Sequence, residues 1–132
     1  EQLAGFVTAK KSIDRTYRMA FADLPEISGF PVLDDRESAC WFTGFRFRHA
    51  QGASHSRALR AALKEAGIDA RPFWKPMHLQ APYKDVPRET MTVSDMIWEQ
   101  IITLPCSTQL TVSEQAYVID TVRAWFRDNG LA

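Results

Sequence analysis

Residues 39–49 read ACWFTGFRFRH, and this stretch has the period-two pattern of a half-buried β-strand. Alternate positions predict a core-facing side made of Ala39, Trp41, Thr43, Phe45 and Phe47. The positions between them include Arg46 and Arg48, which predict the opposite side. A strand with one aromatic face is expected to bury that face against other elements of the fold.

Hydrophobic spacing and turn residues predict helices and short strands on both sides of this strand. A helical pattern runs from Leu3 to Leu24 and ends before Pro25. The remaining predicted elements are an edge strand at 29–33, a helix capped by Ser54 or Ser56 and ending at Gly67, a strand at 68–71, a helix opened by Thr92 or Ser94, a buried strand at 101–104, and a helix from the Thr111–Glu114 capping box to Asn129-Gly130. This order predicts an α+β domain: a small, mostly antiparallel sheet with helices packed on one face and a long N-terminal helix.

Length and charge narrow the class of protein. A chain of 132 residues fits one domain, and its 16 basic and 16 acidic residues balance, which argues against a nucleic-acid surface. No apolar run approaches the ~20 residues of a membrane-spanning helix. Cys40 and Cys106 form no Cys-x-x-Cys pair and have no metal-ligand spacing with the three histidines. We therefore expect reduced thiols, no metal and a cytoplasmic protein.

The segment 70–80, which reads ARPFWKPMHLQ, concentrates the polar groups that could bind a ligand. Its prolines restrict the backbone and can hold polar side chains in one arrangement. Seven basic and only two acidic residues lie between Arg46 and Lys75, which favours an anion nearby. The plainer interpretation is that Arg57, Arg60 and Lys64, which have helical spacing, form a solvated face. The residues alone therefore predict no particular reaction.

Residues 67–80, GIDARPFWKPMHLQ, resemble the signature of the DegT/StrS-type nucleotide-sugar aminotransferases. They are most similar to the branch that makes 4-amino-4,6-dideoxy sugars for glycans and pilin glycosylation. Residues 102–108, ITLPCST, with the Thr111 capping box, are similar to the family's closing "LPxS…T-x-x-E/D" stretch. The resemblance covers nearly all of residues 3–127. The chain departs from the family pattern after Gln80, where Ala81 precedes the proline.

The resemblance implies a fold-type I pyridoxal-phosphate (PLP) enzyme of which this chain is the C-terminal small domain. Residues 1–25 would be a connector helix, although a plain core helix fits the same periodicity, and residues 26–132 would be the small domain. The lysine that carries the cofactor would belong to a preceding large domain, so Lys75 is not our candidate and no PLP bound specifically by this chain is expected. The residues expected to face substrate are Arg71, Trp74, Lys75 and His78.

The implied reaction transfers an amino group from glutamate to a 4-keto-6-deoxy nucleotide sugar in a full-length homodimer, and the present chain alone is expected to be inactive. Two alternatives remain open on the sequence. One is an independent, non-enzymatic α+β domain that binds a partner protein or a phosphorylated ligand. The other is a truncated relative that only regulates or dimerises. The coding sequence upstream of Glu1 would separate these hypotheses.

Overall fold

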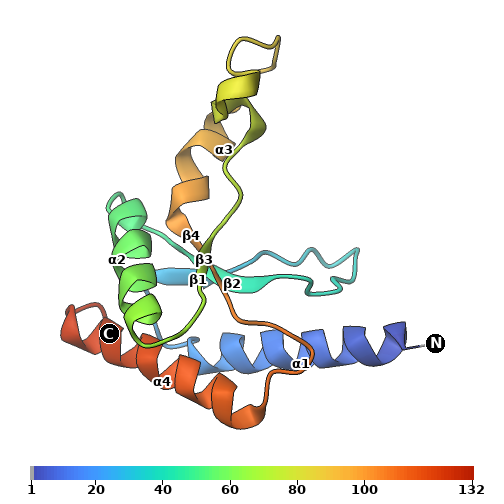
Figure 1. Ribbon diagram of the computed structural model, residues 1–132, viewed down its shortest axis with the longest axis vertical. Coiled ribbons are helices and arrows are strands. Elements are labelled where there is room, and N and C mark those ends of the chain that lie inside the picture. The colour runs from blue at the N-terminus through green and yellow to red at the C-terminus, as the bar shows by residue number, and fades with distance from the viewer. Residues whose placement is uncertain (1) are drawn as a thin grey trace.

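The computed structural model describes residues 2–132, which form four α-helices and one four-stranded sheet (Figure 1). The helices are α1 (Leu3–Ala20), α2 (Gly52–Glu65), α3 (Thr92–Ile97) and α4 (Val112–Asp128). The strands are β1 (Ile27–Gly29), β2 (Thr43–Phe47), β3 (Arg71–Pro72) and β4 (Ile101–Leu104). Their order in the sheet is β1-β2-β4-β3 and each neighbouring pair is antiparallel, which confirms the predicted α+β class.

The central strands β2 and β4 approach closely because β2 has a glycine where it pairs with β4. Gly44 pairs with Thr103 in the ladder and has a φ of +157°. A Cβ atom at Gly44 would lie 2.0 Å from the carbonyl oxygen of Ile102, well inside van der Waals contact. This position therefore requires a residue without a side chain.

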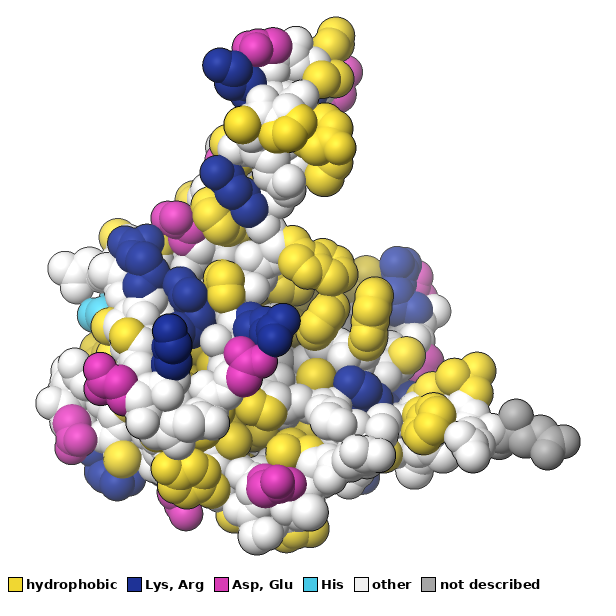
Figure 2. All heavy atoms as spheres, in the orientation of Figure 1, with side chains coloured by type: hydrophobic (Ala, Val, Ile, Leu, Met, Phe, Trp, Pro, Cys, Tyr) yellow, Lys and Arg dark blue, Asp and Glu magenta, His cyan; other side chains and the backbone are white. Residues whose placement is uncertain are grey.

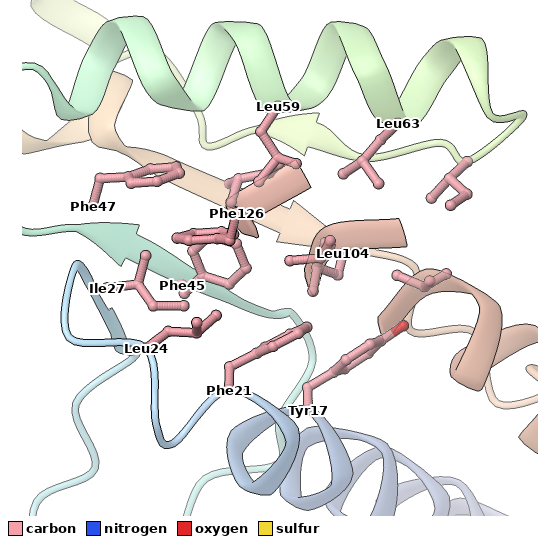
Figure 3. Packing of buried hydrophobic residues seen from close by; sticks show 14 of the residues in the cluster. Tyr17, Phe21, Leu24, Ile27, Phe45, Phe47, Leu59, Leu63, Leu104 and Phe126 are labelled. Atoms are coloured by element: carbon pink, nitrogen blue, oxygen red, sulfur yellow. The ribbon is translucent and has the colours of Figure 1, made fainter. Parts of the chain in front are cut away.

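The hydrophobic core lies between one face of the sheet and the helices α1, α2 and α4. In Figure 3, Leu59 and Leu63 point from α2 towards the strands, and Tyr17 and Phe21 point there from α1. The buried core side chains are Ile13, Tyr17, Phe21, Leu24, Ile27, Phe45, Phe47, Leu59, Leu63, Ile68, Ile102, Leu104, Val118, Val122 and Phe126. The period-two pattern thus correctly predicted which face of β2 is buried at Phe45 and Phe47.

A buried polar chain fixes the second half of α1 to the sheet. The hydroxyl of Thr43 donates to Asp14 over 2.6 Å, and Arg18 donates to the other oxygen of Asp14 and to the carbonyl of Phe30 over 2.8 Å. Near the start of α1, Leu3 is exposed. The second half of the helix therefore belongs to the core, and the role of α1 as a connector stays a prediction.

Several predicted boundaries differ from the structure. The helix expected to reach Leu24, within the 1–25 connector, ends at Ala20, because the chain turns so that Phe21 and Leu24 enter the core; residue 1 lies outside the described residues. The edge strand is Ile27–Gly29, before Pro31, rather than 29–33. The long strand is limited to Thr43–Phe47, and Trp41 is 68% exposed instead of core-facing.

The helix ends show where the capping predictions were right and wrong. The capping box is confirmed, with Thr111 and Glu114 each satisfying the other's backbone N–H at the start of α4. Gly67 follows the C-terminal end of α2 and has a positive φ, as expected for the glycine that ends a helix. The caps predicted at Ser54 and Ser56 are wrong, because α2 begins at Gly52 and Ser56 is buried against the carbonyl of Ile101.

Residues 73–99, which we call the arm, project from the sheet (Figure 1). The arm leaves the sheet after β3 and returns at β4, two strands that pair with each other. It contains α3, the two short 3-10 turns Met77–Leu79 and Ala81–Tyr83, and most of a third at Trp98–Gln100. None of its residues is buried. Among residues 2–132, no helix combines the length and apolar character needed to cross a membrane.

Candidate functional site

A cavity of about 610 Å³ lies at the base of the arm, between the loop that follows β3 and helix α3. The loop contributes Trp74, Lys75 and His78 to the lining of this cavity. The segment that leads back to β4 contributes Met91 and Trp98. The lining is mainly apolar, with a few polar groups among the rings, which is the usual composition of a small-molecule site. Three of the four predicted site residues therefore share one concavity.

His78 is the most tightly held polar group of this cavity. Its side chain is only 10% exposed, and its Nε2 lies 2.5 Å from Oδ1 of Asp95 in α3. An ionised carboxylate only accepts hydrogen bonds, so Nε2 carries the proton and donates it to Asp95. This contact orients the ring, and in the tautomer that donates from Nε2 the other nitrogen, Nδ1, is the acceptor. Asp95 was not among the predicted site residues, because it lies 17 positions away in a different element.

Trp74 belongs to a cluster of exposed and half-buried rings beside the cavity, which we call the aromatic cluster. Its members are Phe30, Trp41, Phe42, Phe73 and Trp74. The ring of Trp74 meets Phe42 edge to face at 5.2 Å between centroids and Trp41 at 6.0 Å. Trp74 is 61% exposed, so the cluster presents indole faces to the outside. On the face seen in Figure 2, hydrophobic side chains gather beside the base of the arm.

Lys75 contributes a free cation at the cavity rim. Its backbone carbonyl accepts a hydrogen bond from the Gln80 side chain over 2.9 Å, which closes the loop around the 3-10 turn. Its ammonium group is exposed and has no hydrogen-bond or ion-pair partner within residues 2–132. The group can therefore meet an anion without first losing another contact.

Arg71 lies apart from the other three predicted residues. It stands on β3 outside the cavity lining, and its guanidinium donates to both oxygens of Asp69, with the shortest contact at 2.7 Å. These hydrogen bonds lower the pKa of Asp69. The backbone carbonyl of Arg71 accepts from the hydroxyl of Thr103. In this structure Arg71 pairs with its own loop, and the geometry does not bring it to the cavity.

The comparisons with known proteins point to one family. The profile of the DegT/DnrJ/EryC1/StrS aminotransferase family matches residues 1–123. No curated protein sequence is significantly similar to the chain. Among solved structures, the aminotransferase TlmJ from Streptoalloteichus hindustanus has a TM-score of 0.83 at 22% identity, covering 96% of this chain and 33% of that one.

Two further structures give the same result. The putative sugar aminotransferase Spr1654 from Streptococcus pneumoniae, in its apo form, has a TM-score of 0.81 at 24% identity, covering 96% of this chain and 32% of its own. PseC from Helicobacter pylori, an aminotransferase involved in the biosynthesis of pseudoaminic acid, has a TM-score of 0.80 at 18% identity, covering 92% and 33%. The present chain thus spans about one third of the length of these structures. It belongs to the DegT/DnrJ/EryC1/StrS aminotransferase family and corresponds to one domain of such an enzyme.

Proposed function

We propose that this chain is the C-terminal small domain of a PLP-dependent enzyme that transfers an amino group from glutamate to a 4-keto-6-deoxy nucleotide sugar. The observation that carries the proposal is the meeting of Trp74, Lys75 and His78 in one cavity at the base of the arm. An indole face, a free ammonium and an oriented imidazole are the groups that a sugar linked to a diphosphate would use. The finer assignment to 4-amino sugars for glycans and pilin glycosylation follows from the resemblance of residues 67–80. The cytoplasmic location follows from Cys40 and Cys106, which we expect to be reduced thiols.

Each cavity residue has a distinct task in this proposal. Trp74 offers a flat apolar face against which a sugar or base ring can lie. Lys75 attracts the diphosphate as a mobile point charge. His78 keeps its Nδ1 turned from Asp95 and accepts a hydrogen bond from a sugar hydroxyl. Arg71 can bind the anion only after it breaks its ion pair with Asp69, so its contribution to binding is smaller.

The residues of this chain do not fit a cofactor pocket of their own. A lysine that holds PLP needs a desolvated setting and a cradle for the phosphate group. Lys75 is exposed, and the wall around it is mostly rings and methionine. PLP supplies the electron sink of transamination when bound, and we assign its binding to the rest of a full-length homodimeric enzyme. The role of this chain is therefore to bind and orient the nucleotide sugar.

Exposed apolar groups support the idea of a neighbouring domain. Leu3 and Phe6 in the first half of α1 are exposed, as are Trp41 and Trp74 in the aromatic cluster. Apolar surface of this kind is typical of an interface. We propose that the large domain covers part of it and that α1 leads towards that domain. The chain alone is then expected to be monomeric or weakly associating.

The test uses the complete enzyme and steady-state kinetics with the nucleotide sugar. Lys75→Ala is expected to raise KM about tenfold, because it removes binding that is equal in the ground and transition states. His78→Ala and Asp95→Ala are expected to lower kcat/KM about tenfold or more, because one removes the imidazole and the other removes the acceptor that orients it. Lys84→Ala, in the exposed end of the arm, is the matched control and should change neither constant more than about twofold. Unchanged kcat and KM in both Lys75→Ala and His78→Ala would contradict the proposal.

A further inference from the structure

A second concave region lies between α2 and the loop 67–70, and we call it the basic groove. It has a volume of about 530 Å³. Arg57, Arg60 and Lys64 of α2 line one side, and Asp69 lies on the loop side. Positions three and four apart share one helix face, so the three cations form a row along the groove. Figure 2 shows this gathering of Lys and Arg side chains over α2.

Among residues 2–132, acidic groups balance the charges of the basic groove only in part, and Glu99 is the acidic group that acts on both Arg57 and Arg60. Asp69 is the acidic residue of the lining, and its carboxylate already accepts hydrogen bonds from the guanidinium of Arg71. Arg57 has one acidic neighbour, Glu99, at the long distance of 3.4 Å. Within residues 2–132, the side chains of Arg60 and Lys64 have no hydrogen-bond or ion-pair partner. The row therefore presents a net positive field to the groove.

Arg60 is the residue that distinguishes this groove from a solvated helix face. Its Nε is buried and has no hydrogen-bond partner. No other buried side-chain nitrogen or oxygen among residues 2–132 lacks one. Burial, and then the like charge of Arg57, lower the pKa of Arg60 from its ordinary value. A buried, unpartnered guanidinium N–H is costly because it has lost water without gaining an acceptor. The Arg60 side chain lines the groove, so an anionic oxygen there would draw the guanidinium towards an acceptor and offset the repulsion from Arg57.

We propose that the basic groove binds a phosphate-type oxyanion, held by the Arg60 guanidinium and attracted by Arg57 and Lys64. A guanidinium can bind two oxygens of one phosphate at once, while Lys64 acts as a point charge. The same chemistry fits inorganic phosphate and the phosphate groups of a nucleotide. The groove lies outside the cavity that contains Trp74, Lys75 and His78, so this site is separate from the proposed sugar site.

The direct test is a titration of the full chain with inorganic phosphate in low-salt buffer, followed through the Arg60 Nε–H signal in ¹H–¹⁵N NMR spectra. We expect a saturable shift of that signal, because the guanidinium turns towards the bound anion and its donors gain an acceptor. Arg60→Gln is expected to weaken phosphate binding about tenfold or more, the effect of losing one charge-assisted contact. Arg127→Gln, which removes the same charge from an exposed position at the end of α4, should change the affinity less than about twofold.

Thermal unfolding gives a second readout that does not depend on NMR. Phosphate should raise the Tm of the wild-type chain and of Arg127→Gln, since a ligand that binds the folded state stabilises it, and should raise the Tm of Arg60→Gln much less. Arg60→Gln should itself fold, because it removes a half-buried cation that lacks a partner. An unmoved Arg60 signal, or equal weakening by both substitutions, would overturn the proposal and indicate only general charge screening.

Two further ligands identify the source of the oxyanion. If pyrophosphate and uridine diphosphate bind equally well, the groove recognises the phosphate groups alone. If uridine diphosphate binds about tenfold tighter than pyrophosphate, the groove also contacts the nucleoside. Both results support the site. A raised KM for the nucleotide sugar in Lys75→Ala of the complete enzyme, with unchanged phosphate binding, would separate the groove from the proposed sugar site.

Discussion

The packed layer of sheet, α1, α2 and α4 differs from the arm in what determines its shape. In the layer, 15 apolar side chains are buried against one another, and their packing determines the positions of the helices and strands. In the arm no residue is buried, and shape follows from prolines, 3-10 turns and a few polar contacts such as that between His78 and Asp95. The candidate sugar site lies where the two regions join. The layer thus holds the groups that we propose to bind ligand on a segment that contributes little to the core.

The largest expected difference between the two regions is in their response to truncation of a large side chain. Phe47 is fully buried and stacks on Phe126, with ring centroids 5.7 Å apart. Phe47→Ala should lower the free energy of unfolding by about 3–5 kcal/mol, because it removes apolar burial and leaves a cavity. Met96 in the arm is 56% exposed, so Met96→Ala should cost less than about 1 kcal/mol. Urea unfolding of both variants measures the difference, and equal losses would show that the arm is part of the cooperative core.

Helix capping sharpens the comparison at a smaller scale. At the start of α4, the Thr111 hydroxyl accepts from the backbone N–H of Glu114 over 3.2 Å. Thr111→Ala should destabilise the chain by about 1 kcal/mol. In the arm, Thr92 begins α3 but no side chain caps that helix. Thr92→Ala should therefore change the free energy of unfolding by less than about 0.5 kcal/mol in the same experiment. A larger loss from Thr92→Ala than from Thr111→Ala would reverse the ranking.

The smallest expected effect is a pH dependence confined to the layer. Arg123 of α4 donates two hydrogen bonds to Asp23, which lower the pKa of Asp23 from 3.8 to about 2. A carboxyl whose pKa is lower in the folded state stabilises that state above its ordinary pKa. This contribution is lost as the pH falls from about 4 towards about 2.

The unfolding midpoints of the wild type and Asp23→Asn should consequently differ slightly at pH 7 and converge towards pH 2. Asp85→Asn, at an exposed position in the arm, is the control and should not show this convergence. NMR titration of the Asp23 carboxyl gives its pKa directly, and an ordinary value near 3.8 would contradict the expectation.

The sequence predicted most of the layer because local signals and burial agree there. The four residues of β4 are all buried, so a continuous apolar run was sufficient, and the capping box needs residues only three positions apart. The residue at which β2 begins could not be predicted from alternation alone. Its partner β4 stops at Leu104 before Pro105, so Trp41 has no strand to pair with and turns outward. Pattern alone cannot indicate how long a partner strand will be.

The candidate site was predicted less completely, for a related reason. The loop containing Trp74, Lys75 and His78 is contiguous and rich in chemically active groups, so composition alone singled it out. The contact of His78 with Asp95 depends on the path of the arm, which no periodicity encodes. Likewise, Arg60 has helical spacing with its neighbours, and only the structure shows that its Nε is buried without a partner.

The arm begins and ends on β3 and β4, which are hydrogen-bonded neighbours at one edge of the sheet. Insertions or deletions between them leave both anchoring strands in register. The entropy of closing such a loop grows only slowly with its length, by about 0.6 kcal/mol for each doubling. Evolution, or an engineer, can therefore exchange this segment as a module and alter ligand preference while leaving the scaffold's folding largely untouched.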